Sequence, residues 1–132
     1  KQIRTRLQQI GLYRDTGHEH LNGCVVFPIT AADGSQRIVD IYGRKTGLLL
    51  RSGTPLDMHL NEERRGVWNI QALRAGQEII LSPSLFDALT FWSNGYRNVT
   101  CMFGHDALTD DIMAAFAEFG IVLEKFVHSA LQ

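Results

Sequence analysis

The sequence has 132 residues, of which 45% are hydrophobic and 20% charged, and its formal net charge is −1. This composition fits one ordinary globular domain or two small subdomains, and it suffices to bury a core without disulfides or metals. The near-neutral charge excludes a global basic field, so any nucleic-acid contact has to come from a local patch. The longest apolar runs are far too short to span a bilayer, so no membrane contact is expected.

The two cysteines, Cys24 and Cys101, lie far apart in the sequence and form no CxxC pair. A structural zinc site is therefore not expected. Reduced core thiols are the default interpretation, and they indicate a cytoplasmic protein. Because the chain begins with Lys1 rather than methionine, we expect it to be a piece of a longer protein.

The first half of the chain has the pattern of a β-rich subdomain. Ile3 and Leu7 lie at helical spacing before a glycine stop. Short alternating apolar runs then flank Ala31–Gly34, which has the residues of a hairpin turn. The expected elements are a helix over 2–13, strands over 24–29, 37–42, 47–51 and 58–60, and a short helix that ends at Leu73.

From residue 76 onward the pattern changes to β-α-β-α-β. Three consecutive apolar residues, Ile79 to Leu81, are typical of a strand buried on both faces. Ser82 is expected to cap the next helix, with Pro83 at its first position, and Thr109 is expected to cap the helix after that. The expected elements are strands over 78–81, 99–103 and 121–127 and helices over 83–94 and 110–119.

These patterns predict an α+β fold in two parts. A β-rich N-terminal subdomain is expected over 1–75. A partial α/β layer with a parallel sheet and crossover helices is expected over 76–132. In such a layer ligands bind beyond the carboxyl ends of the strands, which directs the search for a site to residues 81–84, to residues 103–106 and to whatever follows Val127.

Two long runs resemble the core of bacterial-type DNA primases. The run NGCVVFPITAADGSQRIVDIYGRK, residues 22–45, is similar to the primase segment that leads from an apolar strand ending in Phe-Pro to a Gly-Arg motif. The run EIILSPSLFDALTFWSNGYRNVTCMFGHDALT, residues 78–109, resembles the opening of a Toprim domain, the metal-binding module of primases and topoisomerases. The resemblance covers roughly residues 11–120, and DALTFW and GYRNVT look most similar to primase-like proteins of phages and mobile elements.

The resemblance implies a role in DNA replication. The parent protein would synthesise RNA primers on single-stranded DNA, with Mg²⁺ or Mn²⁺ as cofactor. Single-stranded DNA, nucleotides and a replication helicase are the implied partners. Arg44 and Lys45 match the Gly-Arg motif, and Arg64 and Arg65 stand where the family has a basic residue before a Gly-x-aromatic stretch. These four residues are implied to contact phosphates, for which arginine is well suited, and a solvated charged turn is the alternative interpretation.

The same resemblance indicates that the metal-binding half is incomplete. The family has a Glu at the end of the first Toprim strand, an Asp four residues later and an Asp-x-Asp after the third strand, because Mg²⁺ prefers oxygen ligands. Pro83 stands at the Glu position, Asp87 matches the Asp, and the run after Gly120 contains no Asp. Asp87 is thus a vestigial metal ligand at most. We expect the chain to be catalytically incompetent and to bind no metal, whether by truncation or by degeneration.

Two alternatives stay open beside the primase-like fragment. One is a non-catalytic module that binds single-stranded nucleic acid or a replication partner on the primase scaffold. The other is an α/β domain with an unrelated protein-interaction role. A metal site at His18-Glu19-His20 is not expected, because two histidines in a loop lack further ligands. The remaining acidic candidates, Asp106, Asp110 and Asp111, are expected at a helix N-terminus.

Overall fold

The computed structural model describes residues 1–76, 78–104 and 108–122. The chain divides into two compact units, Lys1–Trp68 and Asn69–Gln132. The expected boundary after residue 75 falls inside the second unit, because a helix over Ile70–Ala75 packs against the strand over Val99–Cys101. The mixture of an antiparallel sheet and a parallel pair of strands confirms the α+β class.

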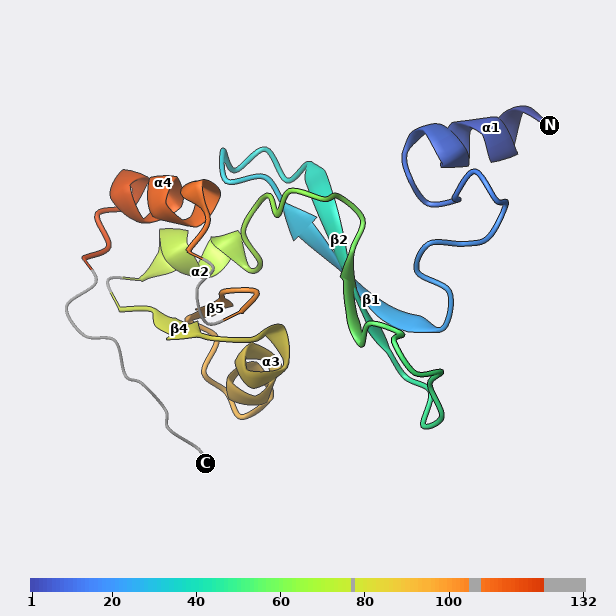
Figure 1. The fold of residues 1–132 in the computed structure, drawn as a ribbon. Coiled ribbons are helices and arrows are strands. Elements are labelled where there is room, and N and C mark those ends of the chain that lie inside the picture. The colour runs from blue at the N-terminus through green and yellow to red at the C-terminus, as the bar shows by residue number, and fades with distance from the viewer. Residues whose placement is uncertain (77, 105–107, 123–132) are drawn as a thin grey trace. The chain divides into compact units, whose positions relative to one another are not determined.

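The first unit contains one helix and an antiparallel sheet (Figure 1). The sheet has the strand order β1-β2-β3, and its register places Cys24 opposite Lys45 and Tyr42 opposite His59. This arrangement confirms the predicted hairpin. The elements are α1 (Gln2–Gln9), β1 (Cys24–Thr30), β2 (Ile38–Lys45) and β3 (Asp57–His59).

The hairpin turn between β1 and β2 is closed by its own polar side chains. Oδ1 of Asp33 accepts the backbone N–H of Ser35 at 2.9 Å, and its Oδ2 lies 3.0 Å from Nη2 of Arg37. The hydrogen bonds from Ser35 are the main cause that lowers the pKa of Asp33 to about 2, and the one from Arg37 is the next. An aspartate that bonds its own backbone two residues ahead is a common device of turns.

One predicted strand is wrong. Residues 47–51 form an exposed loop, in which the side chains of Leu48 and Leu49 are 100% and 98% exposed. The sheet of this unit consists of β1, β2 and β3, and no residue of the run 47–51 pairs with these strands. Three consecutive leucines imitate a buried strand, and sequence periodicity cannot separate the two cases.

The segment that leaves the sheet crosses the end of β1 very closely. The backbone N–H of Val67 donates to the carbonyl of Thr30 at 2.8 Å, and the Thr30 hydroxyl donates to the carbonyl of Val67 at 3.2 Å. Gly66 has a φ of +80°, and a Cβ there would lie 2.4 Å from the Thr30 oxygen. Only glycine fits this position, both for its backbone conformation and for the space.

The second unit is a β-α-β-α layer. β4 and β5 run parallel, with Ile80 opposite Val99 and Ser82 opposite Cys101, and α3 connects them. The described residues thus confirm the predicted parallel pair, whereas the predicted third strand at 121–127 lies mostly outside them. The elements are α2 (Ile70–Ala75), β4 (Ile80–Ser82), α3 (Leu85–Ser93), β5 (Val99–Cys101) and α4 (Asp110–Glu118).

Buried apolar side chains from α2, α3, α4 and β5 with its C-terminal end form the core of the second unit. They pack in the way expected for a sheet covered by crossover helices. Among the described residues, no helix has both the length and the apolar character needed to cross a membrane. The buried apolar residues of this unit are Ile70, Ala72, Leu73, Leu85, Ala88, Val99, Cys101, Met102, Ile112, Ala115 and Phe116.

The start of α3 differs from the prediction. Ser84, not Ser82, is the N-cap residue, since its Oγ accepts the backbone N–H of Asp87 at 3.1 Å. Pro83 therefore precedes the cap and is not the first helical residue. Ser82 is buried in the sheet, and its hydroxyl donates to the carbonyl of Ser84 at 2.6 Å. The predicted cap of α4 is confirmed, because Oγ1 of Thr109 accepts the N–H of Ile112 at 3.3 Å.

Candidate nucleic-acid interface

Arg44 lies on β2, where the pairing with β3 places it opposite Asp57. Its Nη1 donates to Oδ1 of Asp57 at 3.0 Å, and the hydroxyl of Tyr42 donates to the same oxygen at 2.5 Å. The side chains of Arg44 and Asp57 are 37% and 47% exposed. A half-exposed ion pair of this kind contributes only about 0–1 kcal/mol. A phosphate could therefore replace the carboxylate at little cost in free energy.

Tyr42 and Arg44 influence each other's protonation. Burial, followed by the hydrogen bond to Asp57, raises the pKa of Tyr42 to about 12. The hydrogen bond with Tyr42 is the first cause that raises the pKa of Arg44 above its ordinary value. The guanidinium thus keeps its positive charge at a defined position on the sheet.

Lys45 is the last residue of β2 and lies opposite Cys24, the first residue of β1. Its Nζ donates to the backbone carbonyl of Asn22, and the N–H of the following Thr46 donates to the carbonyl of Gly23 at 3.1 Å. These bonds hold the ammonium near the start of β1. Arg44 and Lys45 therefore place two cations at the same end of the sheet, as expected for neighbours on one strand.

The structure does not bring the second predicted pair to this end. Arg64 and Arg65 are exposed in the turn before Gly66, and a Cβ on Gly66 would lie 2.7 Å from Cγ2 of Val39. Val39 and Arg44 are five positions apart on β2, which corresponds to about 17 Å along a strand. The two basic pairs therefore mark opposite ends of β2 rather than one compact patch.

A buried hydrogen-bonded cluster that the sequence did not indicate lies in the same sheet. Asp40 is 1% exposed, and its Oδ2 accepts Nδ1–H of His59 at 2.7 Å. Its Oδ1 accepts the backbone N–H groups of Ile41 at 2.8 Å and of Asn61 at 3.2 Å. A buried carboxylate needs such partners to offset its desolvation. The signal in the sequence is a charged residue on the inward-facing side of an alternating strand, where Tyr42 follows two positions later.

The loop before β1 is tied to this cluster. Nε2 of His20 lies 2.8 Å from the carbonyl oxygen of His59, and Nε of Arg14 donates to Nδ1 of His20 at 3.3 Å. The hydroxyl of Tyr13 donates to Glu19 at 3.1 Å. Hydrogen bonds within the protein therefore explain His20 and Glu19. The part of the chain that the structure describes contains no group of three or more His, Cys, Asp or Glu residues able to hold a metal ion.

The carboxyl ends of β4 and β5 lie side by side, as the fold class predicts. The N–H of Met102 donates to the carbonyl of Ser82 at 2.8 Å, and the N–H of Gly104 donates to the carbonyl of Pro83 at 3.1 Å. Pro83 is thus at the edge of the sheet where ligands bind in parallel α/β layers. Its ring offers neither a metal ligand nor a proton acceptor.

Asp87 is the third residue of α3 and is exposed. Its Oδ2 accepts the hydroxyl of Ser84 at 2.6 Å while its backbone N–H donates back to that hydroxyl. Its carboxylate is therefore part of a reciprocal helix cap. Pro83 beside it offers no ligand, and Asp87 belongs to no group of three or more His, Cys, Asp or Glu side chains among the described residues. The site therefore does not fit a divalent cation.

The other acidic candidates have mixed outcomes. Asp110 and Asp111 lie in the first turn of α4, as predicted. Asp106 lies outside the described residues. Carboxylates at a helix N-terminus interact favourably with the helix dipole, so Asp110 and Asp111 need no ligand to explain them.

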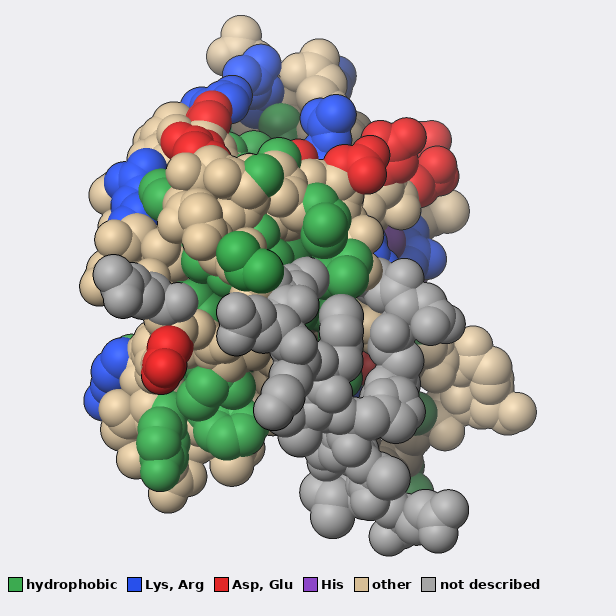
Figure 2. Space-filling view, turned by 90° about the vertical axis from the view of Figure 1, so that its left-hand side faces the viewer, with side chains coloured by type: hydrophobic (Ala, Val, Ile, Leu, Met, Phe, Trp, Pro, Cys, Tyr) green, Lys and Arg blue, Asp and Glu red, His purple; other side chains and the backbone are tan. Residues whose placement is uncertain are grey.

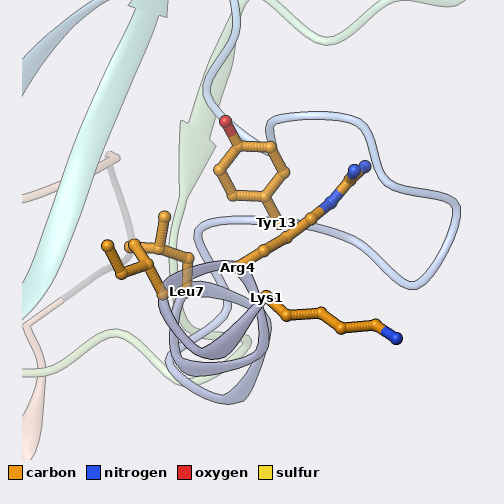
Figure 3. A pocket seen from close by; sticks show the side chains of 5 residues that line it. Lys1, Arg4, Leu7 and Tyr13 are labelled. Carbon is orange, nitrogen blue, oxygen red and sulfur yellow. The ribbon is translucent and has the colours of Figure 1, made fainter.

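An open hollow of about 480 Å³ lies beside α1 and is lined by Lys1, Ile3, Arg4, Leu7 and Tyr13 (Figure 3). The guanidinium of Arg4 lies 5.8 Å from the centre of the Tyr13 ring and donates to the carbonyl of Gly17 at 3.2 Å. None of the residues predicted as a site lines this hollow. It therefore adds no reactive group to the basic residues of the sheet.

No protein-family model matches the sequence, and no curated protein is significantly similar to it. Solved structures do match. A DNA primase domain from Pseudomonas aeruginosa aligns with a TM-score of 0.62 and 21% identity, over 86% of this chain and 38% of that one. The E. coli primase catalytic core aligns with a TM-score of 0.63 and 18% identity, over 88% of this chain and 39% of that one.

A third match is a DnaG primase catalytic domain bound to single-stranded DNA. It has a TM-score of 0.60 and 18% identity, over 86% of this chain and 39% of that one. At these identities the likeness shows the fold, so the chain has the fold of part of a DNA primase catalytic core, as the sequence predicted. The chain spans less than two fifths of the length of these structures. More particularly, the fold is that of bacterial DnaG primases.

Proposed function

We propose that this chain acts in DNA replication as part of a primase-like protein, and that it binds single-stranded DNA without metal-dependent nucleotidyl transfer. The observation that supports the proposal best is the basic pair Arg44 and Lys45 on the sheet of a chain that has a primase-core fold. One protein of similar fold is a primase catalytic domain bound to single-stranded DNA.

The arrangement of charges favours a flexible, extended ligand. Arg44 lies near one end of β2, and Arg65 precedes Gly66, which lies beside Val39 near the other end, about 17 Å away along the strand. A single strand can follow such a row of separated cations, each of which neutralises a phosphate. The net charge of −1 means that these local cations, and not a general basic field, have to provide the attraction.

The side chains at the edge of the parallel strands support the absence of metal-dependent nucleotidyl transfer. Pro83 supplies no ligand at the edge of the parallel strands, and the carboxylate of Asp87 accepts the hydroxyl of Ser84. Primer synthesis by a longer protein would require carboxylates from outside the described residues. Nucleotides, a replication helicase, a cytoplasmic location, Mg²⁺ or Mn²⁺ in the parent, and an origin in a phage or mobile element remain proposals from the resemblance.

Fluorescence anisotropy with a labelled single-stranded oligonucleotide in EDTA tests DNA binding by the first unit. Arg44→Ala and Arg65→Ala are each expected to weaken binding, and each to reduce the slope of log affinity against log salt by about 1. Arg6→Ala is the matched control, because it removes one charge from α1 of the same unit. Equal effects of all three variants would show that only total charge matters, and the proposed site would be wrong.

A primer-synthesis assay with Mg²⁺ or Mn²⁺, nucleoside triphosphates and a single-stranded template tests the absence of catalysis. No primer is expected from residues 1–132. Robust synthesis by this chain would contradict the argument from Pro83 and Asp87. Binding without synthesis supports the proposal, and an absence of both would favour the alternative of an unrelated protein-interaction domain.

A further inference from the structure

Aromatic rings gather at the surface of the second unit, at the end of α3. Phe91 and Trp92 are 41% and 42% exposed, and Tyr96, in the turn that follows, is 56% exposed. Single exposed apolar residues are common, but adjacent large rings at one place indicate a binding surface. Hydrophobic side chains are also plainly visible among charged ones on the face drawn in Figure 2.

The backbone holds these rings in place. Gly95 has a φ of +97° and ends α3, and the N–H of Tyr96 donates back to the carbonyl of Phe91 at 3.0 Å. The rings of Phe91 and Tyr96 meet edge to face, with centres 6.1 Å apart and planes at 84°. The surface is therefore formed before any ligand binds, which lowers the entropic cost of binding.

Arg97 adds a positive charge to this surface. Its guanidinium carbon lies 3.4 Å from the centre of the Trp92 ring, which is a stacked arrangement. Nδ2 of Asn69 donates to the backbone carbonyl of Arg97 at 3.1 Å and fixes the chain there. Among the residues that the structure describes, the guanidinium forms no hydrogen bond or ion pair, so its N–H groups are available to an anion.

We infer that Phe91, Trp92, Tyr96 and Arg97 form a stacking site for the bases of single-stranded nucleic acid, with Arg97 on the phosphate backbone. The inference rests on the proposed binding of single-stranded DNA and adds a second contact site in the second unit. Exposed aromatic rings bind unpaired bases through their faces, and a stacked arginine contributes both a planar face and phosphate contacts. Duplex DNA does not fit, because its bases are already stacked on one another.

A comparison of normal and abasic oligonucleotides separates stacking from charge. Trp92→Ala is expected to weaken binding of oligothymidylate by roughly 10-fold, the loss typical of one stacked base. It should leave the affinity for an abasic strand of the same length unchanged. Arg97→Ala should weaken binding of both strands, because it removes a phosphate contact. Arg74→Ala is the matched control, since Arg74 lies 5.8 Å from the Phe119 ring in the same unit.

Tryptophan fluorescence gives a second measurement that does not depend on truncating the ring. Saturation with oligothymidylate should quench the emission, and Trp92→Phe, which retains a ring, should abolish most of the quenching while binding persists. Binding of oligothymidylate with no quenching from Trp92 and no effect of Trp92→Ala would overturn the inference and leave the proposed function intact. If the unaltered chain bound no oligonucleotide at all, the proposed function and this inference would both fall.

Discussion

The hydroxyl of Ser84 donates to Oδ2 of Asp87 at 2.6 Å, and its oxygen accepts the backbone N–H of Asp87 at 3.1 Å. This reciprocal contact closes the first turn of α3. It provides a structural reason for the one acidic residue that matches the Toprim pattern. Asp87 can therefore be retained for helix stability in the absence of any bound metal.

Ser84→Ala is expected to lower the free energy of unfolding by about 1 kcal/mol, because the first turn of α3 loses its N-cap. Urea denaturation measures this change. Asp87→Asn should cost less, since it preserves the backbone bond to Ser84. Millimolar Mg²⁺ should not alter the thermal midpoint of either variant or of the unaltered chain. A rise in the midpoint with Mg²⁺ that disappears in Asp87→Asn would show that Asp87 does bind metal.

Asp40→Ala is expected to lower the free energy of unfolding by about 3–5 kcal/mol, because it removes a buried carboxylate that accepts hydrogen bonds from His59 and from the backbone N–H groups of Ile41 and Asn61. Denaturation at neutral pH measures the loss. Asp33→Ala is the control, since this ion pair with Arg37 is exposed and its removal should lower the free energy of unfolding much less. Similar losses of unfolding free energy for both variants would mean that the buried Asp40–His59 contact stabilises the sheet no more than an exposed ion pair does.

Tyr42 should ionise with a pKa of about 12, against an ordinary value of 10. Because the pKa of Tyr42 is raised in the folded state, its protonated hydroxyl stabilises the folded chain. This contribution to the free energy of unfolding is fully present below pH 10 and is lost as the pH rises from about 10 to about 12. Ultraviolet absorbance during alkaline titration reports this step, and Tyr42→Phe should remove it. A titration in which Tyr42 ionises near pH 10 would contradict the buried hydrogen bond to Asp57.

Cys101 should resist alkylation while the chain is folded. Burial raises the pKa of its thiol to about 12, so that the reactive thiolate is about a thousandfold rarer than at the ordinary value of 9.0. Cys24 is only half-buried and should react first. Mass spectrometry after brief treatment with iodoacetamide measures both sites. Rapid labelling of Cys101 in the native chain would indicate that β5 is not in the core.

The local patterns of the sequence were sufficient for the hairpin and for the β-α-β layer. The turn residues around Gly34 indicate a hairpin turn, and the consecutive apolar residues before α3 indicate a buried strand. The local patterns did not distinguish the exposed loop at 47–51 from a strand, because a short run of leucines has the same apolar pattern whether it is exposed or buried, and only the structure shows that Leu49 is exposed. The cap of α3 was also misplaced by two residues, since both Ser82 and Ser84 have suitable side chains.

The spatial arrangement of the candidate site residues was predictable only where these residues are neighbours in sequence. Arg44 and Lys45 could be identified from one motif, but their distance from Arg65 depends on which end of β2 the segment at Gly66 crosses. The contact between Asp40 and His59 joins residues 19 positions apart and requires the register of the sheet. The stacking of Arg97 on Trp92 likewise depends on the turn at Gly95, and residue types alone do not show it.

The affinity of the unaltered chain for single-stranded DNA, measured by anisotropy over a range of salt in EDTA and again in Mg²⁺, tests the central claim most directly. We predict binding at low salt that weakens steeply as salt rises, because phosphate contacts release counterions. At matched ionic strength, the affinity should be the same with and without Mg²⁺. An absence of binding at low salt, or binding that requires Mg²⁺, would contradict the claim that this primase-fold chain binds single-stranded DNA through its own basic residues without a metal.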